Sequence, residues 1–328
     1  MKFDIKRVGV LTSGGDSPGM NATIRAVVRS CTYHKLKCVG IYRGFDGLIE
    51  NDFITLNARA VKNIINRGGT FLKSSRSSEF RTKEGRNKAI INLQKEKIDA
   101  LVVIGGDGTF RGASVLSKEY DIVIIGIPGT IDNDINGTDF SIGYDTALNT
   151  VVEAIDKIRD TAHSHNRLFL IEVMGRDAGD IALNAGIGAG AEEILIPEQN
   201  MGKDRLVESL KRSKKSGKTS SIIVVSEGDK IGKNIFKLAK YIEENLVEYE
   251  VRVSVLGYIQ RGGSPSCFDR VLASRLGVGA IDALLKGERN VMVGLKHNKI
   301  VSVPFSKAVK GDNKLDLELI RVADIMSI

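Results

Sequence analysis

The stretch Thr130-Ile131-Asp132-Asn133-Asp134 places two carboxylates one residue apart. Two anions this close together repel each other unless a cation lies between them, and stability alone does not explain such an arrangement. We expect one carboxylate to be the base that accepts a hydroxyl proton and the other to orient an arginine or a metal. The alternative is an Asx-rich turn, which would be favoured if this stretch stood alone.

Two glycine-rich loops could bind phosphate. Gly14-Gly15-Asp16 precedes a helix-like segment that begins near Asn21, so its unhindered N–H groups could meet a phosphate where a helix dipole favours negative charge. A tight turn explains this motif equally well. Gly105-Gly106-Asp107-Gly108-Thr109 is the stronger signal, because glycines beside an acid leave room for a nucleotide and Asp107 could hold Mg²⁺ together with ATP phosphates. The alternative for Asp107 is a helix cap.

Arginines could supply the positive charge that this chemistry needs. One guanidinium group can bind two phosphate oxygens at once. Six arginines lie in or beside loops at the ends of strand-like runs. Any one of them could form a surface ion pair, whereas six on loops of one polarity favour phosphate recognition. The six are Arg76, Arg81, Arg167, Arg176, Arg252 and Arg261. The histidines (His34, His163, His165, His297) show no metal-site spacing.

Short β-branched runs must position these loops. They cover residues 8–11, 101–104, 122–127, 168–173, 222–225 and 253–256, and segments with helical spacing separate them. Strands that alternate with helices predict an α/β protein with mostly parallel sheets. Each run ends in a glycine-rich or acidic loop, and ligands of open α/β sheets bind at the carboxyl ends of the strands. The sequence therefore predicts an active site assembled from such loops.

Length and composition limit the class of protein. A chain of 328 residues suits two domains with a cleft between them, and 42% hydrophobic with 27% charged residues is typical of a folded globular protein. The net charge of +8 attracts anions without identifying them. The densest basic run, residues 211–215, has no interleaved aromatic residues, which favours a solvated helix end over a nucleic-acid patch.

Cysteine usage and the N-terminal segment predict a cytoplasmic protein. Three cysteines without CxxC spacing (Cys31, Cys38, Cys267) argue against a disulfide framework or a zinc site. Residues 1–7 contain no apolar export segment, and no apolar run approaches the length that spans a bilayer. We therefore expect no membrane partner.

Five motifs in series resemble the bacterial-type ATP-dependent 6-phosphofructokinases (the phosphofructokinase A family) from Val8 to about Gly294. The motifs match in content, order and spacing, although GGDG alone also resembles the nucleotide loop of lipid and NAD kinases. They are Gly14-Gly15-Asp16-Ser17-Pro18-Gly19-Met20-Asn21, Gly105-Gly106-Asp107-Gly108-Thr109, Pro128-Gly129-Thr130-Ile131-Asp132-Asn133-Asp134, Met174-Gly175-Arg176 and Gln260-Arg261-Gly262-Gly263-Ser264-Pro265.

The resemblance implies two Rossmann-like three-layer αβα lobes with mostly parallel sheets and the active site in the cleft between them. Residues 1–142 plus 255–307 would form the larger ATP-binding lobe. Residues 143–254 plus 308–328 would form the smaller lobe, which binds fructose 6-phosphate. The implied reaction moves the γ-phosphoryl group of ATP to the 1-hydroxyl of fructose 6-phosphate with Mg²⁺ as cofactor.

The resemblance also implies residue roles. Asp132 is the implied base, Arg76 and Arg176 stabilise charge on the transferring group, and Thr130 contacts the sugar. The implied ATP contacts are Gly15, Arg76, Ser77, Gly106, Asp107, Gly108 and Thr109, with Phe45 and Phe80 near the base and Asp107 on the metal. The implied sugar-phosphate contacts are Thr130, Ile131, Asp132, Met174, Gly175, Arg176, Glu227, Tyr258 and Arg261, with Arg167 and Arg252 from a neighbouring subunit.

A shared site of this kind implies a homotetramer. The pattern of an effector site for ADP and phosphoenolpyruvate is matched by Arg25, Arg29, Arg159, Gly190, Glu192 and Lys218. Ala58 and Ser216 depart from this pattern, where known members have arginine and lysine, and Tyr258 stands where the family usually places a histidine.

Glycine at positions 108 and 129 favours ATP as the donor, because pyrophosphate-using relatives typically carry aspartate and lysine there. Three alternatives stay open: a pyrophosphate-dependent phosphofructokinase, a non-catalytic phosphate-sensing paralogue that kept the fold, and a basic nucleic-acid-binding protein, the weakest of the three.

Overall fold

The computed structural model describes residues 5–165, 167–199, 201–217, 221–247, 249–309 and 316–326. The chain divides into two compact units. The first comprises Met1–Thr146 and Arg261–Asp312, and the second comprises Ala147–Gln260 and Asn313–Ile328. One helix, α5 (Tyr144–His165), begins in the first unit and continues into the second.

The first unit contains, among its described residues, a seven-stranded sheet in the order β11-β10-β5-β4-β1-β2-β3. Pairs within β10-β5-β4-β1-β2 are parallel, while β3 and β11 join the two edges antiparallel. The strands are β1 (Arg7–Thr12), β2 (Lys37–Ile41), β3 (Phe53–Leu56), β4 (Ala100–Gly105), β5 (Val123–Pro128), β10 (Val291–Lys296) and β11 (Lys299–Pro304).

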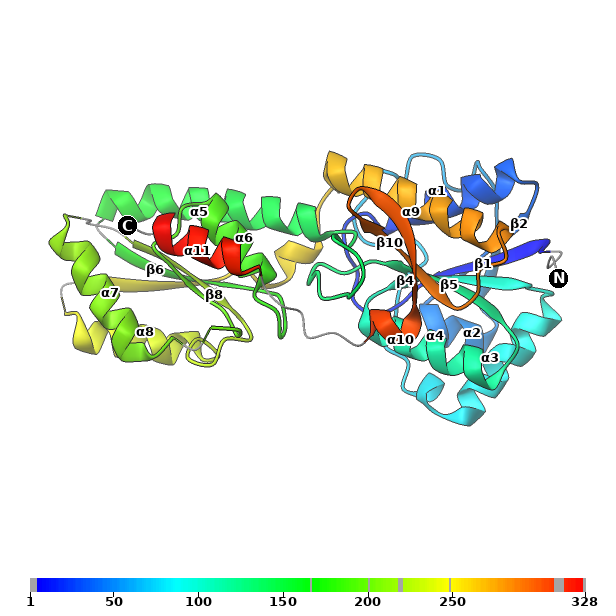
Figure 1. The fold of residues 1–328 in the computed structure, drawn as a ribbon, viewed down its shortest axis with the longest axis horizontal. Helices are drawn as coiled ribbons and strands as arrows, with labels where there is room; N and C mark the ends of the chain where they lie inside the picture. Colours follow the sequence, from blue (N-terminus) through cyan, green and yellow to red (C-terminus); the bar gives the residue numbers. More distant parts are fainter. Residues whose placement is uncertain are drawn as a thin grey trace. The chain divides into compact units, whose positions relative to one another are not determined.

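Helices cover both faces of this sheet (Figure 1). On one face lie α1 (Met20–Tyr33) and α9 (Cys267–Leu285), which share an apolar core with β1, β4 and β5. The other face is covered by α2 (Gly44–Glu50), α3 (Lys83–Lys95), α4 (Asp107–Glu119) and α10 (Phe305–Ala308). A short helical turn, η1 (Glu79–Arg81), directly precedes α3. Strands buried on both faces explain why β4 and β5 read as continuous apolar runs.

The second unit has a smaller sheet, in which the described residues form four parallel strands in the order β7-β8-β6-β9. These are β6 (Arg167–Val173), β7 (Glu193–Leu195), β8 (Ser221–Ser226) and β9 (Glu250–Val255). α7 (Lys203–Lys215) and α8 (Ile235–Asn245) pack on one face, and Figure 1 shows α5 and α6 (Asp180–Gly188) over the other. The unit also includes α11 (Leu317–Met326), which packs on α6, and η2 (Gly257–Arg261) leads back to the first unit.

The predicted fold class is confirmed, because both units are α/β layers built on mostly parallel sheets. Runs predicted as strands coincide with β1, β4, β5, β6, β8 and β9. The sequence did not predict β2, β3, β7, β10 or β11. Within the described ranges, every helix is too short or too polar to cross a lipid bilayer.

Candidate active site

Three loops meet at the carboxyl edge of neighbouring strands β1, β4 and β5 in the first unit. Hydrogen bonds join them: Ser13 N donates to the carbonyl oxygen of Ile104 at 3.0 Å, and Gly129 N donates to that of Gly105 at 3.0 Å. Thr109 Oγ1 donates to the carbonyl oxygen of Ser13 at 3.1 Å. The strand order reverses direction beside β1, which is where open α/β sheets bind ligands.

Glycine allows this close approach. A Cβ atom added to Gly105 would lie 2.4 Å from both the Ser13 carbonyl oxygen and Thr109 Oγ1. The opposite holds at Gly108, where an added Cβ would meet no atom within 4 Å. The loops therefore interlock at Gly105 and leave open space beside Gly108.

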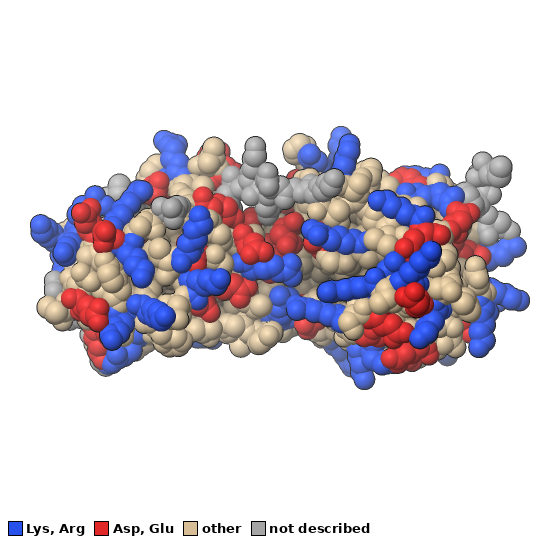
Figure 2. All heavy atoms as spheres, turned by 90° about the horizontal axis from the view of Figure 1, so that it is seen from below, with Lys and Arg blue, Asp and Glu red and all other residues tan. Residues whose placement is uncertain are grey.

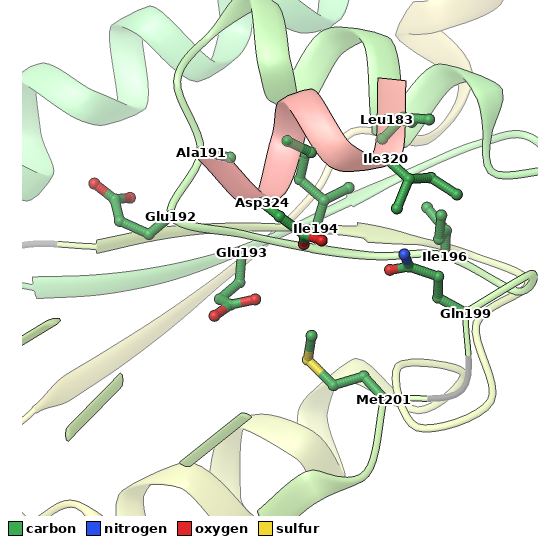
Figure 3. Close-up of a pocket in the computed structure, with 11 residues that line it drawn as sticks. Leu183, Ala191, Glu192, Glu193, Ile194, Ile196, Gln199, Met201, Ile320 and Asp324 are labelled. Carbon is green, nitrogen blue, oxygen red and sulfur yellow. The ribbon is translucent and has the colours of Figure 1, made fainter. Parts of the chain in front are cut away.

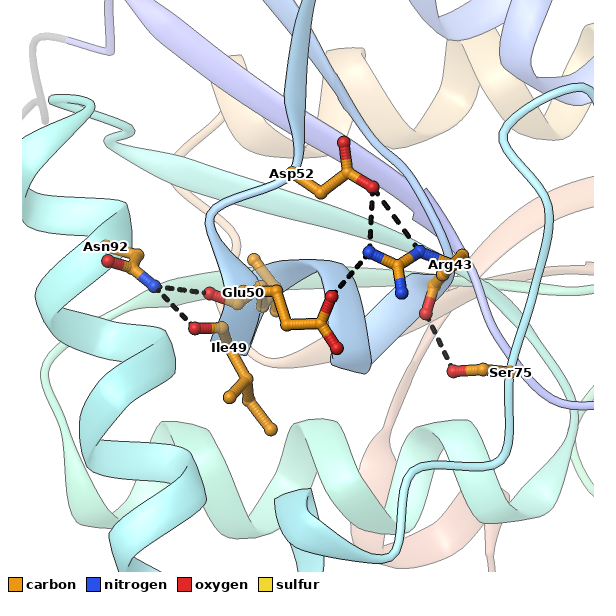
Figure 4. A network of polar contacts seen from close by, with 7 residues as sticks. Arg43, Ile49, Glu50, Asp52, Ser75 and Asn92 are labelled. Atoms are coloured by element: carbon orange, nitrogen blue, oxygen red, sulfur yellow. Dashed lines mark hydrogen bonds and ion pairs between the residues drawn. The ribbon is translucent and has the colours of Figure 1, made fainter.

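Arg43 holds the segment that carries two predicted ATP contacts (Figure 4). Its guanidinium bridges Glu50 at 2.6 Å and Asp52 at 3.0 Å, and its carbonyl oxygen accepts a hydrogen bond from Ser75 Oγ at 2.7 Å. Gly14 N in turn donates to the Ser75 carbonyl oxygen at 3.3 Å. The segment is therefore tied to the first glycine loop.

Two of the predicted ATP contacts follow directly after this tie. Arg76 is exposed, and the Oγ of Ser77 accepts a hydrogen bond from Phe80 N at 3.1 Å. The structure thus brings Arg76 and Ser77 beside the Gly14-Gly15 loop. Arg43 was missed by sequence reasoning, and only its position shortly before acidic residues at 50 and 52 hinted at a bridge.

Phe45 and Phe80 stack on each other, with ring centroids 4.0 Å apart and planes 11° apart. Both are about 95% buried and belong to the core beneath α4. An added Cβ on Gly112 would lie 3.2 Å from the Phe45 ring and 3.3 Å from the Phe80 ring. The two rings form a wall against α4, and their contact with a nucleotide base stays a prediction.

Asp107 is the first residue of α4, where its carboxylate complements the helix dipole. Its Oδ2 lies 2.8 Å from Nε of Arg111, and its side chain is 26% exposed. Within the described ranges, no three His, Cys, Asp or Glu side chains gather as a metal-binding group. One accessible carboxylate suits Mg²⁺ that takes its other ligands from phosphates and water.

Asp132 is 2% exposed in the loop after β5. Its backbone N–H donates to Thr130 Oγ1 at 3.2 Å, and Ser141 Oγ donates to the Thr130 carbonyl oxygen at 2.7 Å. Asn133, at φ 51°, adopts a left-handed conformation and accepts a hydrogen bond from Ser141 N at 2.9 Å. The loop is therefore fixed by its own turn and by the segment around Ser141.

Arg261 lies beside the first glycine loop. Its Nη1 donates to the Asp16 carbonyl oxygen at 3.3 Å and would be 2.7 Å from a Cβ added to Gly15. A residue predicted for the sugar phosphate thus contacts a predicted ATP loop, both within the first unit.

In the second unit, the loop after β6 carries Met174, Gly175 and Arg176. Met174 N donates to Gln260 Oε1 at 3.1 Å, and Arg176 N donates to Glu227 Oε1 at 2.8 Å. Gly175 and Arg176 both have positive φ, 141° and 55°. A non-glycine residue in this conformation is strained, and such strain clusters at functional sites.

Buried polar groups support this loop. Gln260 is fully buried, and burial followed by the nearby Glu227 charge raises the pKa of Glu172. Sequence reasoning missed Gln260 as a support, although it stands in the matched Gln-Arg-Gly-Gly motif. Tyr258, in contrast, is 84% exposed.

Arg167 and Arg252 do not lie at the carboxyl ends of their strands, so the expectation of six arginines on loops of one polarity is wrong for these two. Arg167 opens β6, and Arg252 pairs with Phe169 near the same end. Because a strand rises about 3.3 Å per residue, the seven residues of β6 separate Arg167 from the carboxyl end by about 20 Å. Both guanidinium groups instead contact the carboxylate of Glu250.

The predicted effector residues fall into two groups. Arg25 and Arg29 share α1, and burial followed by the Arg29 charge lowers the pKa of Arg25. In the second unit, Arg159 Nη2 donates to the carbonyl oxygens of Ala189 and Gly190 at 2.7 Å each, and Nη1 lies 3.7 Å from Glu192. Lys218 lies outside the described residues.

Two surface features carry no site. A cavity between α6, β7 and α11, lined by Glu193 and Asp324 among others (Figure 3), measures about 20 Å³ and has room for a water molecule rather than a nucleotide. On the face in Figure 2, basic and acidic side chains are interspersed over both units. That pattern gives no support to a nucleic-acid stripe.

Comparison with known proteins finds relatives that match nearly the whole chain. The family model described as Phosphofructokinase matches residues 7–284. The chain is 52% identical over 324 residues to the ATP-dependent 6-phosphofructokinase 2 of Bacteroides thetaiotaomicron, with 99% of each chain covered. It is 53% identical over 325 residues to the ATP-dependent 6-phosphofructokinase of Listeria monocytogenes, covering 99% of this chain and 100% of the relative.

Solved structures are similar as well. The structure of phosphofructokinase from Saccharomyces cerevisiae matches with a TM-score of 0.88 and 35% identity, covering 98% of this chain and 48% of that longer chain. A pyrophosphate-dependent phosphofructokinase from Marinobacter aquaeolei matches with a TM-score of 0.84 over 96% of this chain and 86% of its own. At 23% identity, the second match shows the fold alone. The full-length relatives and the family match together show that the chain belongs to the phosphofructokinase family.

Proposed function

We propose that the chain is an ATP-dependent 6-phosphofructokinase. It transfers the γ-phosphoryl group of ATP to the 1-hydroxyl of fructose 6-phosphate and releases fructose 1,6-bisphosphate and ADP, the committed step of glycolysis. The observation that carries this proposal is the meeting of three loops at one sheet edge, where phosphate-binding glycines, Asp107 and the buried Asp132 lie on neighbouring strands. The full-length relatives with this name support it.

The nucleotide binds along the loops after β1 and β4. Backbone N–H groups of Gly15 and of Gly106 to Gly108 donate hydrogen bonds to phosphate oxygens, and Thr109 contributes its side chain. The N-terminus of α4 adds its dipole. Arg76 and Ser77 approach from the neighbouring segment that Ser75 ties to Gly14. Asp107 would hold Mg²⁺, which neutralises charge on the phosphates.

Asp132 accepts the proton of the 1-hydroxyl as that oxygen attacks the γ-phosphorus. Its burial excludes water from the base, and Thr130 fixes the turn that orients it. Arg76 and Arg176 stabilise the negative charge on the transferring group. Positioning and cations supply most of the rate, as expected for phosphoryl transfer.

The family resemblance assigns the contacts with fructose 6-phosphate to residues of both units. The contacts are Thr130, Ile131, Asp132, Met174, Gly175, Arg176, Glu227, Tyr258 and Arg261. Support comes from the fixed backbone of Met174 and Arg176 and from the exposed hydroxyl of Tyr258.

Gly108 supports ATP as the donor. The space beside it is open, so packing within the chain does not demand glycine there. An aspartate at this position would fill the space with a charge that repels the ATP phosphates. Gly129 is a weaker indicator, because an added Cβ would lie 3.2 Å from Ile104, which already favours glycine.

The site is completed by another subunit in a homotetramer. Along the strand direction, Arg167 lies about 20 Å and Arg252 about 13 Å from the carboxyl end of β6, where the loop of Arg176 begins. That separation supports their binding the 6-phosphate of a neighbouring copy rather than of their own. Mixing an Arg252→Ala chain with an Asp132→Asn chain tests this, because hybrid oligomers then contain some intact sites. Regain of activity on mixing is expected, and no regain would contradict the shared site.

An effector site for ADP or phosphoenolpyruvate is supported only in part. Arg159, Gly190 and Glu192 lie together in the second unit, and Arg25 and Arg29 lie together on α1. Titrating ADP and phosphoenolpyruvate into the rate assay, with Arg159→Ala as the variant, decides whether these residues regulate the enzyme.

The deciding experiment measures fructose 1,6-bisphosphate formation with Mg²⁺ and either ATP or pyrophosphate. Turnover with ATP alone is expected. Asp132→Asn should lower kcat by about a thousandfold as a lost general base. Asp139→Asn makes the same change at an exposed aspartate, whose carboxylate accepts a hydrogen bond from His297 N, and should leave kcat unchanged. Turnover with pyrophosphate alone would overturn the donor, and no turnover with either would favour a phosphate-sensing protein.

A further inference from the structure

Asp269, the third residue of α9, is a fully buried carboxylate outside the loops described so far. Its Oδ1 accepts a hydrogen bond from Gly143 N at 2.8 Å. Its Oδ2 accepts hydrogen bonds from Thr146 N at 2.8 Å and from Thr146 Oγ1 at 2.5 Å. Gly143 directly precedes α5 and Thr146 lies in its first turn, so Asp269 clamps residues 143–146.

The clamped segment continues directly into the support of the Asp132 loop. Ile142 N donates to the Pro128 carbonyl oxygen at 3.0 Å, and Ile142 forms an isolated bridge with Gly129. Ser141 Oγ donates to the Thr130 carbonyl oxygen. The residues on both sides of Thr130 therefore depend on where residues 141–143 lie.

The same segment also packs against the first glycine loop. A Cβ added to Gly143 would lie 2.5 Å from Ser17 Cβ, and one added to Gly19 would lie 2.6 Å from Ile142 Cγ2. Residues 142–143 therefore pack so closely against residues 17–19, which lead into α1, that there is no room for an added methyl group. Residues 141–143 thus form a wall that contacts both the first glycine loop and the Asp132 loop, and Asp269 fixes this wall by its hydrogen bond to Gly143 N.

A buried charge is a costly way to fill space. Burial is the main effect on the pKa of Asp269 and raises it, while hydrogen bonds from Thr146 and Gly143 lower it. An apolar side chain would pack here without that desolvation cost. Gly143 N, Thr146 N and Thr146 Oγ1 are all donors. The ionised carboxylate therefore suits the site, because it accepts three hydrogen bonds from atoms in fixed positions.

We propose that Asp269 is a positioning residue for phosphoryl transfer, which fixes the wall that sets the glycine loop and the Asp132 loop relative to each other. This inference rests on the proposed function. It assigns Asp269 no contact with substrate. Its expected contribution is to the rate of the chemical step rather than to the binding of either substrate.

The test compares Asp269→Asn with Asp282→Asn. Both changes remove a charge from α9, but Asp282 is half-exposed and faces His34 at 3.8 Å. In Asp269→Asn, the new side-chain amide would turn an N–H donor toward the donors of Gly143 or Thr146. We expect kcat to fall about thirtyfold, because displacement of reacting groups by less than 1 Å is costly. We expect each KM to stay within about threefold of the native enzyme and the control to be unchanged.

Two results would overturn the proposal. One is an unchanged kcat in Asp269→Asn. The other is a loss of activity that matches the unfolded fraction measured by circular dichroism at the assay temperature, since that would make the role purely structural. Should Asp269→Asn not fold, Thr146→Val decides, because it removes the hydroxyl bond to Asp269 together with the acceptor of Ser266 N and leaves the carboxylate in place. A fall in kcat of about fivefold at an unchanged KM is expected.

Hydrogen exchange separates this proposal from the proposed function. Amides of residues 129–134 should exchange faster in Asp269→Asn than in Asp282→Asn, whatever reaction the native protein catalyses. If the native protein lacks kinase activity, the proposed function fails while this measurement still reports on the clamp. Equal exchange in the two variants would refute the clamp itself.

Discussion

In the first unit, backbone hydrogen bonds join the loops after β1, β4 and β5. In the second unit, Glu227 N likewise donates to the Val173 carbonyl oxygen at 2.9 Å, but the loop after β6 also donates hydrogen bonds to the side chains of Glu227 and Gln260. The first arrangement fixes the phosphate-binding groups before any ligand arrives, which is how electrostatic catalysis gains most. The second adds one carboxylate contact, one carboxamide contact and a strained Arg176 to its backbone bonds. On the proposed function, we expect the first unit to preorganise the chemistry and the second to set the affinity for the sugar phosphate.

The largest effect is expected where the backbones interlock. Gly105→Ala places a methyl group 2.4 Å from the Ser13 carbonyl oxygen, so the loops after β1 and β4 must separate. We expect kcat/KM for ATP to fall about a hundredfold through misplacement of the phosphate groups. Gly202→Ala, outside these loops and with nothing within 4 Å of the new methyl group, is the control. Equal, small losses of kcat/KM for ATP in both variants, measured by steady-state kinetics, would contradict the special role of the interlocked backbones in the first unit.

A smaller and more selective effect is expected in the second unit. Gly228→Ala places a methyl group 2.0 Å from the Arg176 carbonyl oxygen. The Arg176 loop must shift, and we expect KM for fructose 6-phosphate to rise about tenfold while KM for ATP changes little. Gly202→Ala, where a Cβ meets no atom within 4 Å, is the matched control in the same unit. A comparable rise in both KM values would show that the two sites are not separable.

Tyr258 sharpens the same contrast, because it replaces the usual histidine with an exposed phenol. Tyr258→Phe removes one hydrogen-bonding hydroxyl. The Kd for fructose 6-phosphate should rise about fivefold, as for a single lost hydrogen bond. Tyr258→His should retain affinity. Isothermal titration with the sugar phosphate measures both, and an unaltered affinity in Tyr258→Phe would remove Tyr258 from the site.

The smallest expected effect concerns pH and stability. The native state raises the pKa of Glu172 above its ordinary value of 4.5, so the native state binds a proton more readily than the unfolded chain. Stability is therefore lost as pH rises from 4.5 through the raised value. Glu172→Gln should melt at a higher temperature than the native protein at about pH 8, and the difference should vanish at about pH 4. Calorimetry that shows a pH-independent difference would contradict this sign.

Much of the fold could be predicted from apolar runs, and two of the misses, β7 and β11, have physical reasons. Strands β4 and β5 are buried on both faces and are therefore continuously apolar. β7 has only three residues, of which Glu193 and Ile194 are half-buried, and β11 exposes most of its side chains. Such strands owe their place to a neighbour's hydrogen bonds rather than to their own composition, so no apolar run marked them.

The candidate site was predictable where residues adjoin in sequence and not where distant residues meet. Asp132 and the glycine loops stand out by their local composition. The support by Arg43 joins Ser75 across 32 residues, and Asp269 reaches Gly143 across 126. Neither residue stands in an unusual local pattern, because each matters only through partners that the fold brings to it.

The open space beside Gly108 also bears on how donor preference can change in evolution. Glycine and aspartate codons differ by one nucleotide, and the new side chain would meet no atom of the chain within 4 Å of its Cβ. A lineage could therefore acquire that aspartate without passing through an unfolded intermediate. At Gly129 the first added carbon already lies close to Ile104 and Met20. The accessible mutational path would then begin at position 108, with position 129 changing only after its neighbours had made room.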